Sequence, residues 1–325
     1  MYKNISLRKI SYHLPEKVET NEELKILHPD WDVDKVSEKT GIYKRFIADK
    51  QETSLDLGFK ASKNLFKEYQ LKSEEIDALI FVSESPDYVL PPSSCILQEK
   101  LSLRNNILAL DINLGCSGFI NTLAVASSLI KDETIKNCLI ICAETYSKYI
   151  DENNRTNKLI FSDAASACLV ERNYENNSYI GNFNFGCDGK GYKELIVEGS
   201  GARKKIDQEK QKLFMNGPAI LLFTLSQVPL LLFETLKNNN MELDEIDIFI
   251  FHQASKMVLE LLSKKIGIDR SKMYSNLEEI GNTVSCSIPI ALKDAYIENK
   301  FKSNSKILII GFGVGYSLGS TIISW

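Results

Sequence analysis

Short, continuous apolar runs alternate along this chain with longer stretches of helical periodicity, and this alternation constrains the fold more than any other feature. Runs such as 78–82 and 139–142 are apolar at every position instead of at every second one, as expected for strands that are covered on both faces. Strands and helices that alternate in this way predict an α/β fold in layers. The predicted strands are 78–82, 107–110, 139–142, 167–170, 246–251 and 307–310, and the predicted helices are 54–69, 94–101, 117–131, 256–266 and 285–298.

The second half of the chain repeats the order of segments in the first half. Residues 75–81 read EIDALIF and residues 245–251 read EIDIFIF. Each segment is followed by a helical pattern and then by a short turn that opens another helix, at 114–117 in the first half and at 280–283 in the second. Any two strand–helix–strand units look somewhat alike, but three matched segments in one order favour an internal duplication.

The duplication predicts two halves of one layered unit, at 1–172 and 173–325, in place of the two independent domains that a length of 325 residues suggests. Residues 171–213 are rich in Asn, Gly, Lys and Glu, and we expect an exposed polar connection there, with a charged loop at 203–205. The most apolar stretch, 218–233, is interrupted by polar residues and is shorter than the roughly 20 residues that span a bilayer. It therefore predicts a buried helix and no membrane insertion.

Composition excludes several functional classes. Lys and Arg number 39 against 43 Asp and Glu, so the net charge is −4 and no basic excess points to a nucleic-acid partner. Seven cysteines, without a Cys-x-x-Cys pair, favour a reduced cytoplasmic protein without a disulfide framework. The N-terminus does not resemble a signal peptide. None of the three histidines lies near a second ligand at helical spacing, which argues against a metal site.

The first candidate for chemistry is Cys116, which opens an apolar helix at 117–131. The unpaired N–H groups and the positive end of the helix dipole favour a thiolate, which is the nucleophilic form of cysteine. Gly115 and Gly118 leave room beside Cys116 for a substrate or for a second backbone. The alternative is that Cys116 is a buried structural cysteine.

Two further candidates come from the second half. His252 directly follows the apolar strand at 246–251, where α/β folds present reactive groups, although a hydrogen-bonded histidine at a strand end is the simpler alternative. Asn282 could be an ordinary helix N-cap. The duplication, however, places Asn282 at the position that matches Cys116, so that two equivalent helix N-termini would face one site between the halves.

A glycine-rich run near the end of the chain completes the set of motifs. Residues 311–319 follow the strand at 307–310, but they lack the Lys-Ser/Thr pair of a phosphate loop, and the chain continues into a terminal strand instead of a helix. We therefore expect this run to aim backbone N–H groups at an oxyanion.

Taken in order, the motifs GCSGF at 115–119, HQAS at 252–255, GNT at 281–283 and GFGVG at 311–315 resemble the β-ketoacyl-acyl-carrier-protein synthase III family of thiolase-fold condensing enzymes. The resemblance covers nearly the whole chain, and Asn282 stands where the related elongating synthases carry a second histidine. It implies a thiolase-like α/β fold, layered α-β-α-β-α with two pseudo-equivalent halves, and a homodimer.

By this resemblance, Cys116 attacks an acyl thioester and stores the acyl group. His252 and Asn282 then bind the thioester carbonyl of malonyl-acyl-carrier protein, so that loss of CO₂ yields an enolate that attacks the Cys116 thioester. The backbone N–H groups of Cys116 and Val314 form the implied oxyanion hole. No cofactor or metal ion is needed. The alternatives are an acyltransferase of the same fold that forms no carbon–carbon bond, and an inactive scaffold subunit, against which the presence of Cys116 argues.

The resemblance also implies the binding residues for an acyl carrier protein and for acyl-coenzyme A or another acyl thioester. Lys256, Lys264 and Lys265 are expected to meet the acidic carrier protein, although a solvated helix face would also explain them. The family's adenine-stacking Trp has no match at the usual spacing, because Trp31 lies about one helical turn too early and Lys35 takes its place, which argues against coenzyme A recognition. The implied contacts of the acyl thioester are Arg155, Gly217, Leu90, Gly313 and Gly315.

Overall fold

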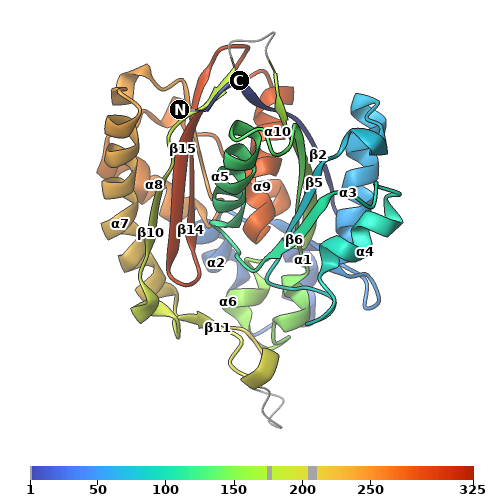
Figure 1. Ribbon diagram of the computed structural model, residues 1–325. Coiled ribbons are helices and arrows are strands. Elements are labelled where there is room, and N and C mark those ends of the chain that lie inside the picture. Colours follow the sequence, from blue (N-terminus) through green and yellow to red (C-terminus); the bar gives the residue numbers. More distant parts are fainter. Residues whose placement is uncertain (1, 174–177, 204–210) are drawn as a thin grey trace.

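The structure is a computed structural model that describes residues 2–173, 178–203 and 211–325. Figure 1 shows two sheets that face each other across a pair of central helices, with further helices on the outer face of each sheet. The predicted α-β-α-β-α layering is therefore confirmed. The outer helices are α7 (Gly217–Asn238) and α8 (Lys256–Ile266) on one side and α3 (Ser54–Tyr69) and α4 (Ser93–Lys100) on the other, and the central helices are α5 (Gly118–Lys131) and α10 (Ser287–Ile297).

The first sheet is built from the first half of the chain. Its strand order is β2 (Ile5–His13), β8 (Ala164–Arg172), β7 (Asn137–Glu144), β5 (Ala78–Val82) and β6 (Leu108–Ile112). β5 runs parallel to both of its neighbours, β6 and β7, whereas β8 is antiparallel to β7 and to β2. Every residue of β5 is buried because helices cover both faces of the sheet, which explains its continuous apolar run.

The second sheet is built mainly from the second half of the chain. Its path is β1 (Tyr2–Lys3), β9 (Tyr179–Ile180), β15 (Ser317–Ser324), β14 (Lys306–Gly313) and β13 (Ile248–Phe251), and β10 (Asn184–Cys187) also pairs with β15. β13 is parallel to β14 and β14 is antiparallel to β15, which repeats the β5–β7–β8 pattern of the first sheet. This repetition supports the predicted duplication. β1 crosses the predicted boundary at residue 172, because the N-terminal strand pairs with β9.

The remaining elements lie around these layers. They are β3 (Lys17–Thr20), α1 (Asn21–Leu27), α2 (Val33–Thr40), β4 (Lys44–Ile47), α6 (Arg155–Lys158), β11 (Leu195–Ile196), β12 (Phe214–Met215) and α9 (Leu277–Ile280), together with short 3₁₀ turns. The connection at 171–213 is more ordered than predicted, because it contributes β9, β10 and β11. Arg203 is exposed, as predicted, while Lys204 and Lys205 lie outside the described residues.

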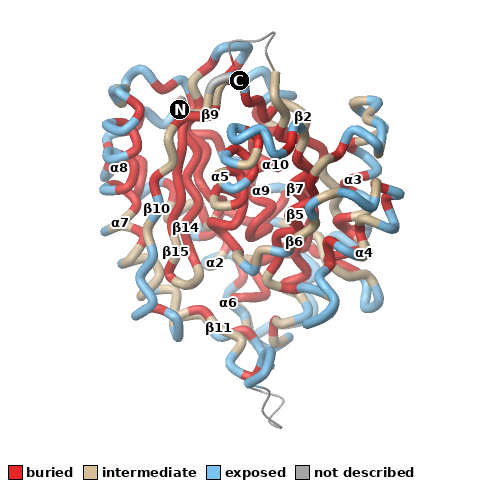
Figure 2. The backbone as a smooth tube through the Cα atoms, viewed as in Figure 1, coloured by how far each residue is buried: buried red, intermediate tan, exposed pale blue. Residues whose placement is uncertain are grey.

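The apolar stretch at 218–233 does form a helix, α7, but the prediction that it is buried is wrong in part. Leu222 and Leu230 keep 73% and 65% of their surface exposed. The opposite face, which includes Val228 and Leu232, packs against β14, β15 and α8. By length and composition alone α7 is apolar enough to cross a membrane. In this fold it is an outer layer, whereas the buried residues concentrate in the sheets and the central helices (Figure 2).

β14, from the second half, passes directly beside the start of α5, from the first half. A Cβ atom added at Gly311 would lie 2.7 Å from the Cα of Ser117 and 2.8 Å from the carbonyl oxygen of Cys116. One added at Gly313 would lie 2.8 Å from the sulfur of Cys116. Carbon atoms in contact normally stay about 3.5–4.0 Å apart. Only glycine at these two positions therefore allows β14 to pack directly against the segment that carries Cys116.

Substitution of Gly311→Ala should destabilise the protein, because the backbone of Cys116 and Ser117 cannot move aside as a flexible side chain could. We expect the free energy of unfolding, measured by urea denaturation, to fall by roughly 1–3 kcal/mol. Gly189→Ala is the matched control, since a Cβ atom there meets nothing within 4 Å. Its effect should stay within about 0.5 kcal/mol. Equal stabilities of the two variants would contradict the close-packing explanation.

Candidate active site

Cys116 lies at the start of α5, directly before the N-cap residue Ser117, and only 6% of its surface is exposed. The backbone N–H groups of Cys116 and Val314 both lie close enough to its sulfur to lower the pKa of the thiol. Val314 belongs to the turn that joins β14 to β15. The two donors predicted for an oxyanion hole therefore converge on one atom, one from each half of the chain.

The surroundings of Cys116 raise the pKa of its thiol well above the ordinary value. The main cause is burial, followed by the carboxyl groups of Glu84 and Glu144. The N–H groups of Cys116 and Val314 lower this pKa. The backbone N–H groups thus lower the pKa of the thiol, as predicted, but burial and the two carboxyl groups raise it more. The protonated thiol is therefore the dominant form at neutral pH.

His252 directly follows β13 and is 2% exposed. Its backbone N–H donates to the carbonyl of Ile310 in β14 (2.8 Å), and its ring nitrogen Nδ1 lies 2.8 Å from the hydroxyl oxygen of Ser287 in α10. The ring also meets Phe312 edge-on, with 5.5 Å between the ring centroids. Burial lowers the pKa of His252 to about 3, although a hydrogen bond with the backbone of Val284 opposes this shift. The imidazole is therefore neutral at pH 7 and can donate through one ring nitrogen.

Asn282 is held in place by the first half of the chain. It forms a parallel bridge with Phe161, in which the Asn282 N–H donates to the Ile160 carbonyl (3.0 Å) and the Ser162 N–H donates to the Asn282 carbonyl (2.9 Å). Its side-chain oxygen accepts a hydrogen bond from the Val284 N–H at 2.9 Å. The helical turns that follow have other N-cap residues, so Asn282 is not the ordinary N-cap that the sequence left as an alternative.

Val284, which no sequence motif marks, connects the three predicted catalytic residues. Its backbone hydrogen-bonds both His252 and Asn282, and its fully buried side chain belongs to the same apolar cluster as Cys116. Val284 has a φ angle of 54°, a left-handed conformation that a β-branched residue rarely adopts and that costs on the order of 1–3 kcal/mol. A positive φ at a valine leaves no sequence pattern, so this residue could not have been found without the structure.

Two carboxyl groups beside Cys116, the buried Glu144 and the partly buried Glu84, were also missed. Glu144 ends β7 and accepts hydrogen bonds from the hydroxyls of Ser85 and Ser285, each at 2.8 Å, so it ties the two halves together. Glu84 follows β5 and accepts a hydrogen bond from the hydroxyl of Tyr146. Burial raises the pKa of Glu84 to about 7, and burial and the nearby Glu84 raise that of Glu144 well above its usual range. Their positions at the ends of apolar strands are the signal that could have found them.

An outer pocket of about 560 Å³ brings Arg155 and Trp31 together. Trp31 belongs to the turn between α1 and α2 and shares this pocket with Arg155, although its spacing in the sequence argues against a role in coenzyme A recognition. His28 stacks on Trp31, with 3.8 Å between the ring centroids and 7° between the planes. The carboxylates of Asp30 and Asp151 also line the pocket, so its charge is mixed.

The other predicted contacts of the acyl thioester are distributed unevenly. Gly313 adjoins Cys116, and Gly315 lies in the same turn as Val314 with a φ angle of 132°, which only glycine adopts readily. Gly217 opens α7, and a Cβ atom there would meet open space. Leu90 is 79% exposed. Its role as a contact of the acyl thioester stays a prediction.

The three lysines predicted to dock a carrier protein lie along α8. Lys264 and Lys265 are exposed, whereas Lys256 is partly buried beside Gly41. Within the part of the chain that the structure describes, none of the three forms an ion pair. α8 packs against α2, which begins two residues after Trp31. The lysines and the outer pocket therefore lie on neighbouring elements.

The layered fold and the buried Cys116, His252 and Asn282 define the class of thiolase-fold condensing enzymes. A model of the family described as 3-oxoacyl-[acyl-carrier-protein (ACP)] synthase III matches residues 110–189, and a model of the C-terminal part of that family matches residues 236–325. The chain belongs to the 3-oxoacyl-[acyl-carrier-protein] synthase III family and is an acyltransferase with that function.

Curated relatives and solved structures match this chain over nearly its whole length. The β-ketoacyl-[acyl-carrier-protein] synthase III of Caldanaerobacter subterraneus is 33% identical over 318 residues, which cover 96% of this chain and 95% of that protein. The β-ketoacyl-[acyl-carrier-protein] synthase III 2 of Staphylococcus epidermidis is 34% identical, with 96% of each chain covered. A crystal structure of a 3-oxoacyl-(acyl-carrier-protein) synthase III has a TM-score of 0.96 and 34% identity, covering 99% of this chain and 100% of that one.

The lowered pKa of His252 should make stability depend on pH. Folded His252 stays neutral down to about pH 3, whereas the same residue in the unfolded chain takes up a proton near pH 6.5. The unfolded state binds more protons between these values, so the free energy of unfolding should fall as the pH falls from about 6.5 toward 3. His252→Asn should remove this contribution. Urea denaturation at pH 4 to 7.5 measures this contribution to the free energy of unfolding. Equal pH dependences of the wild type and the variant would refute the prediction.

Proposed function

We propose that this enzyme condenses an acyl group with malonyl-acyl-carrier protein and that Cys116 is its nucleophile. The observation that supports this role most strongly is the convergence of the Cys116 and Val314 N–H groups on the Cys116 sulfur. When the sulfur attacks an acyl thioester, a new carbon–sulfur bond forms and the carbonyl oxygen becomes an oxyanion beside these donors, which can bind it. Collapse of this intermediate expels the thiol of the donor, which takes up the proton of Cys116. The covalent acyl-enzyme separates the two substrates in time.

His252 and Asn282 complete the proposed reaction. Because Ser287 occupies Nδ1 of His252, a substrate would bind at Nε2, in competition with the Val284 backbone that also hydrogen-bonds this ring. The Val284 N–H occupies the side-chain oxygen of Asn282, which leaves the amide NH₂ as the donor. Hydrogen bonds from these groups to the malonyl thioester carbonyl would stabilise the enolate that remains when CO₂ departs. The enolate carbon then attacks the acyl carbonyl, a carbon–carbon bond forms, and the bond to the Cys116 sulfur breaks.

Variants should separate the two steps. Cys116→Ala should abolish acylation, measured by the mass of the intact protein after incubation with an acyl thioester. His252→Ala and Asn282→Ala should still become acylated, but their release of CO₂ from malonyl-acyl-carrier protein should fall by about 10²–10³-fold, the usual effect of losing one such donor. Acylation of the wild type without CO₂ release would favour the acyltransferase alternative. No acylation of Cys116 by any acyl thioester would exclude both functions.

The proposed donor is acyl-coenzyme A, bound at the outer pocket. The indole of Trp31 and the guanidinium of Arg155 in one pocket suit a planar base and a phosphate, respectively. The unpaired charges of Lys256, Lys264 and Lys265 on α8 support the acyl carrier protein as the partner in the second step, since cations steer an acidic partner to its site. Seven free cysteines support the cytoplasm as the compartment.

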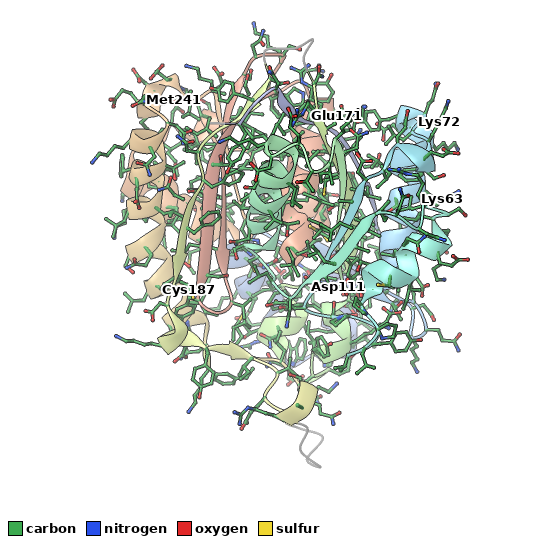
Figure 3. The ribbon with its side chains drawn as sticks, in the orientation of Figure 1. Lys63, Lys72, Asp111, Glu171, Cys187 and Met241 are labelled. Carbon is green, nitrogen blue, oxygen red and sulfur yellow. The ribbon has the colours of Figure 1, made fainter. Side chains whose placement is uncertain are left out.

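A homodimer is proposed across the edge of the first sheet. β6 pairs with β5 on one side, and within the described residues no strand covers its other side. An open edge strand is a template for pairing with a second chain. Asp111, labelled on β6 in Figure 3, accepts hydrogen bonds from the N–H groups of Ser93 and Ser94 at the start of α4, so the preceding loop is fixed beside β6. This loop exposes an apolar surface: Tyr88, Val89 and Leu90 are 58%, 85% and 79% exposed.

Sedimentation over a range of concentrations tests the dimer. The wild type should be a dimer, and Leu90→Glu should weaken the association roughly tenfold or more, because a charge would be buried in the interface. Leu222→Glu is the matched control, since Leu222 is exposed to a similar degree but lies on α7, outside the proposed interface. A wild type that stays monomeric, or a control variant that dissociates while Leu90→Glu does not, would rule out this interface.

A further inference from the structure

The carboxyl group of Glu84 lies next to the nucleophile, and the mechanism above assigns it no role. Its Oε2 atom accepts a hydrogen bond from the hydroxyl of Tyr146, and its carboxyl group also accepts one from the N–H of Gly115, the residue before Cys116. A Cβ atom added at Gly115 would lie 2.2 Å from Oε2 and 2.8 Å from the carboxyl carbon of Glu84. The absence of a side chain at residue 115 therefore lets this carboxyl group reach the start of α5.

The titratable groups that face Glu84 can supply only neutral or negative charge. They are Cys116 at the start of α5, Glu144 at the end of β7, and Tyr146 and Tyr149 in the turn that follows. Among the residues that the structure describes, no Lys, Arg or His forms an ion pair with Glu84 or with Glu144. A negative charge on Glu84 is thus not compensated by a cation, and it acts on the thiol through a buried region of low polarity.

Glu144 differs from Glu84 in its hydrogen bonds. Three serine hydroxyls and the N–H of Glu84 donate to the Glu144 carboxyl group, at distances from 2.8 to 3.4 Å, and they hold it between the halves. Among the described residues, the donors to Glu84 are the Tyr146 hydroxyl and the Gly115 N–H. Glu84 also directly adjoins the nucleophile's own turn, so it is the carboxyl group whose ionisation bears most directly on Cys116.

We propose that Glu84 is a positioning residue that controls the reactivity of Cys116 through charge: as a carboxylate it keeps the neighbouring thiol protonated, and as a neutral acid it allows the thiol to ionise. This inference rests on the proposed role of Cys116 as nucleophile. The thiolate is the form that attacks a thioester, so acylation is favoured when Glu84 carries a proton. Burial raises the pKa of Glu84 to about 7, which brings the change of charge into the physiological range.

Alkylation of Cys116 by uncharged iodoacetamide, followed by peptide mass analysis between pH 6 and 10, tests this proposal. The measurement needs no acyl donor. The proposal for Glu84 can therefore be refuted while the condensing function holds, and the condensing function can be refuted while the proposal for Glu84 holds. Glu84→Gln keeps the shape and the acceptor oxygen but removes the charge. In Glu84→Gln, the midpoint of the pH titration of Cys116 should fall by about one pH unit or more. The rate of Cys116 alkylation at pH 7.5 should be about tenfold higher than in the wild type. Glu84→Asp keeps the charge and should titrate close to the wild type.

Glu133→Gln is the matched control. It removes the same charge from an exposed position beyond the far end of α5, about 20 Å from Cys116 along the helix, and should leave the midpoint unchanged. The exposed Cys187, labelled in Figure 3, is an internal reference in the same digest. The proposal would be overturned if the Cys116 midpoint in Glu84→Gln equalled that of the wild type. It would also be overturned if the midpoint fell as far in Glu84→Asp as in Glu84→Gln. Should Glu84→Gln not fold, a wild-type midpoint at or below the ordinary thiol value of about 8.5 would still overturn the proposal.

Discussion

The close approach of β14 to the start of α5 is the constraint on which the active site depends. Gly311 and Gly313 let the backbone of the second sheet touch the segment that carries Cys116. The same approach brings the Val314 N–H to the Cys116 sulfur. Because one donor of the proposed oxyanion hole comes from each half, neither half of the chain can assemble the site by itself. The two halves are therefore parts of one working unit.

A second set of contacts places the groups that the condensation step requires. Asn282 is paired with the first half through its bridge to Phe161, and Glu144 reaches across to Ser285. Between them lies Val284, whose left-handed backbone hydrogen-bonds His252 and Asn282 at once. Strain at a buried valine persists only where the surrounding contacts hold it. The contacts that hold Val284 position the donors of His252 and Asn282. The same region places the carboxyl groups of Glu84 and Glu144 beside the buried thiol of Cys116.

The sequence predicts those parts of the fold whose signals are local. The bounds of α3 and α8 agree with the predicted helices at 54–69 and 256–266, because side-chain caps at Thr53 and Ser255 mark where they begin. Cys116, His252 and Asn282 could be predicted as site residues because each stands where a strand or turn meets a helix. The role of Val284 and the pocket that Trp31 shares with Arg155 depend on contacts between segments distant in the chain, and the partial exposure of α7 depends on its place in the outer layer. No local pattern encodes such contacts.

A crystal structure of the acyl-enzyme, formed by reaction with an acyl thioester, tests the central claim most directly. The claim is that the two halves together build the site at which the acyl group is held. It predicts an acyl group bonded to the sulfur of Cys116, with its carbonyl oxygen about 2.7–3.1 Å from the backbone nitrogens of both Cys116 and Val314. An acyl group on another residue, or a carbonyl oxygen that contacts only the Cys116 nitrogen, would contradict it.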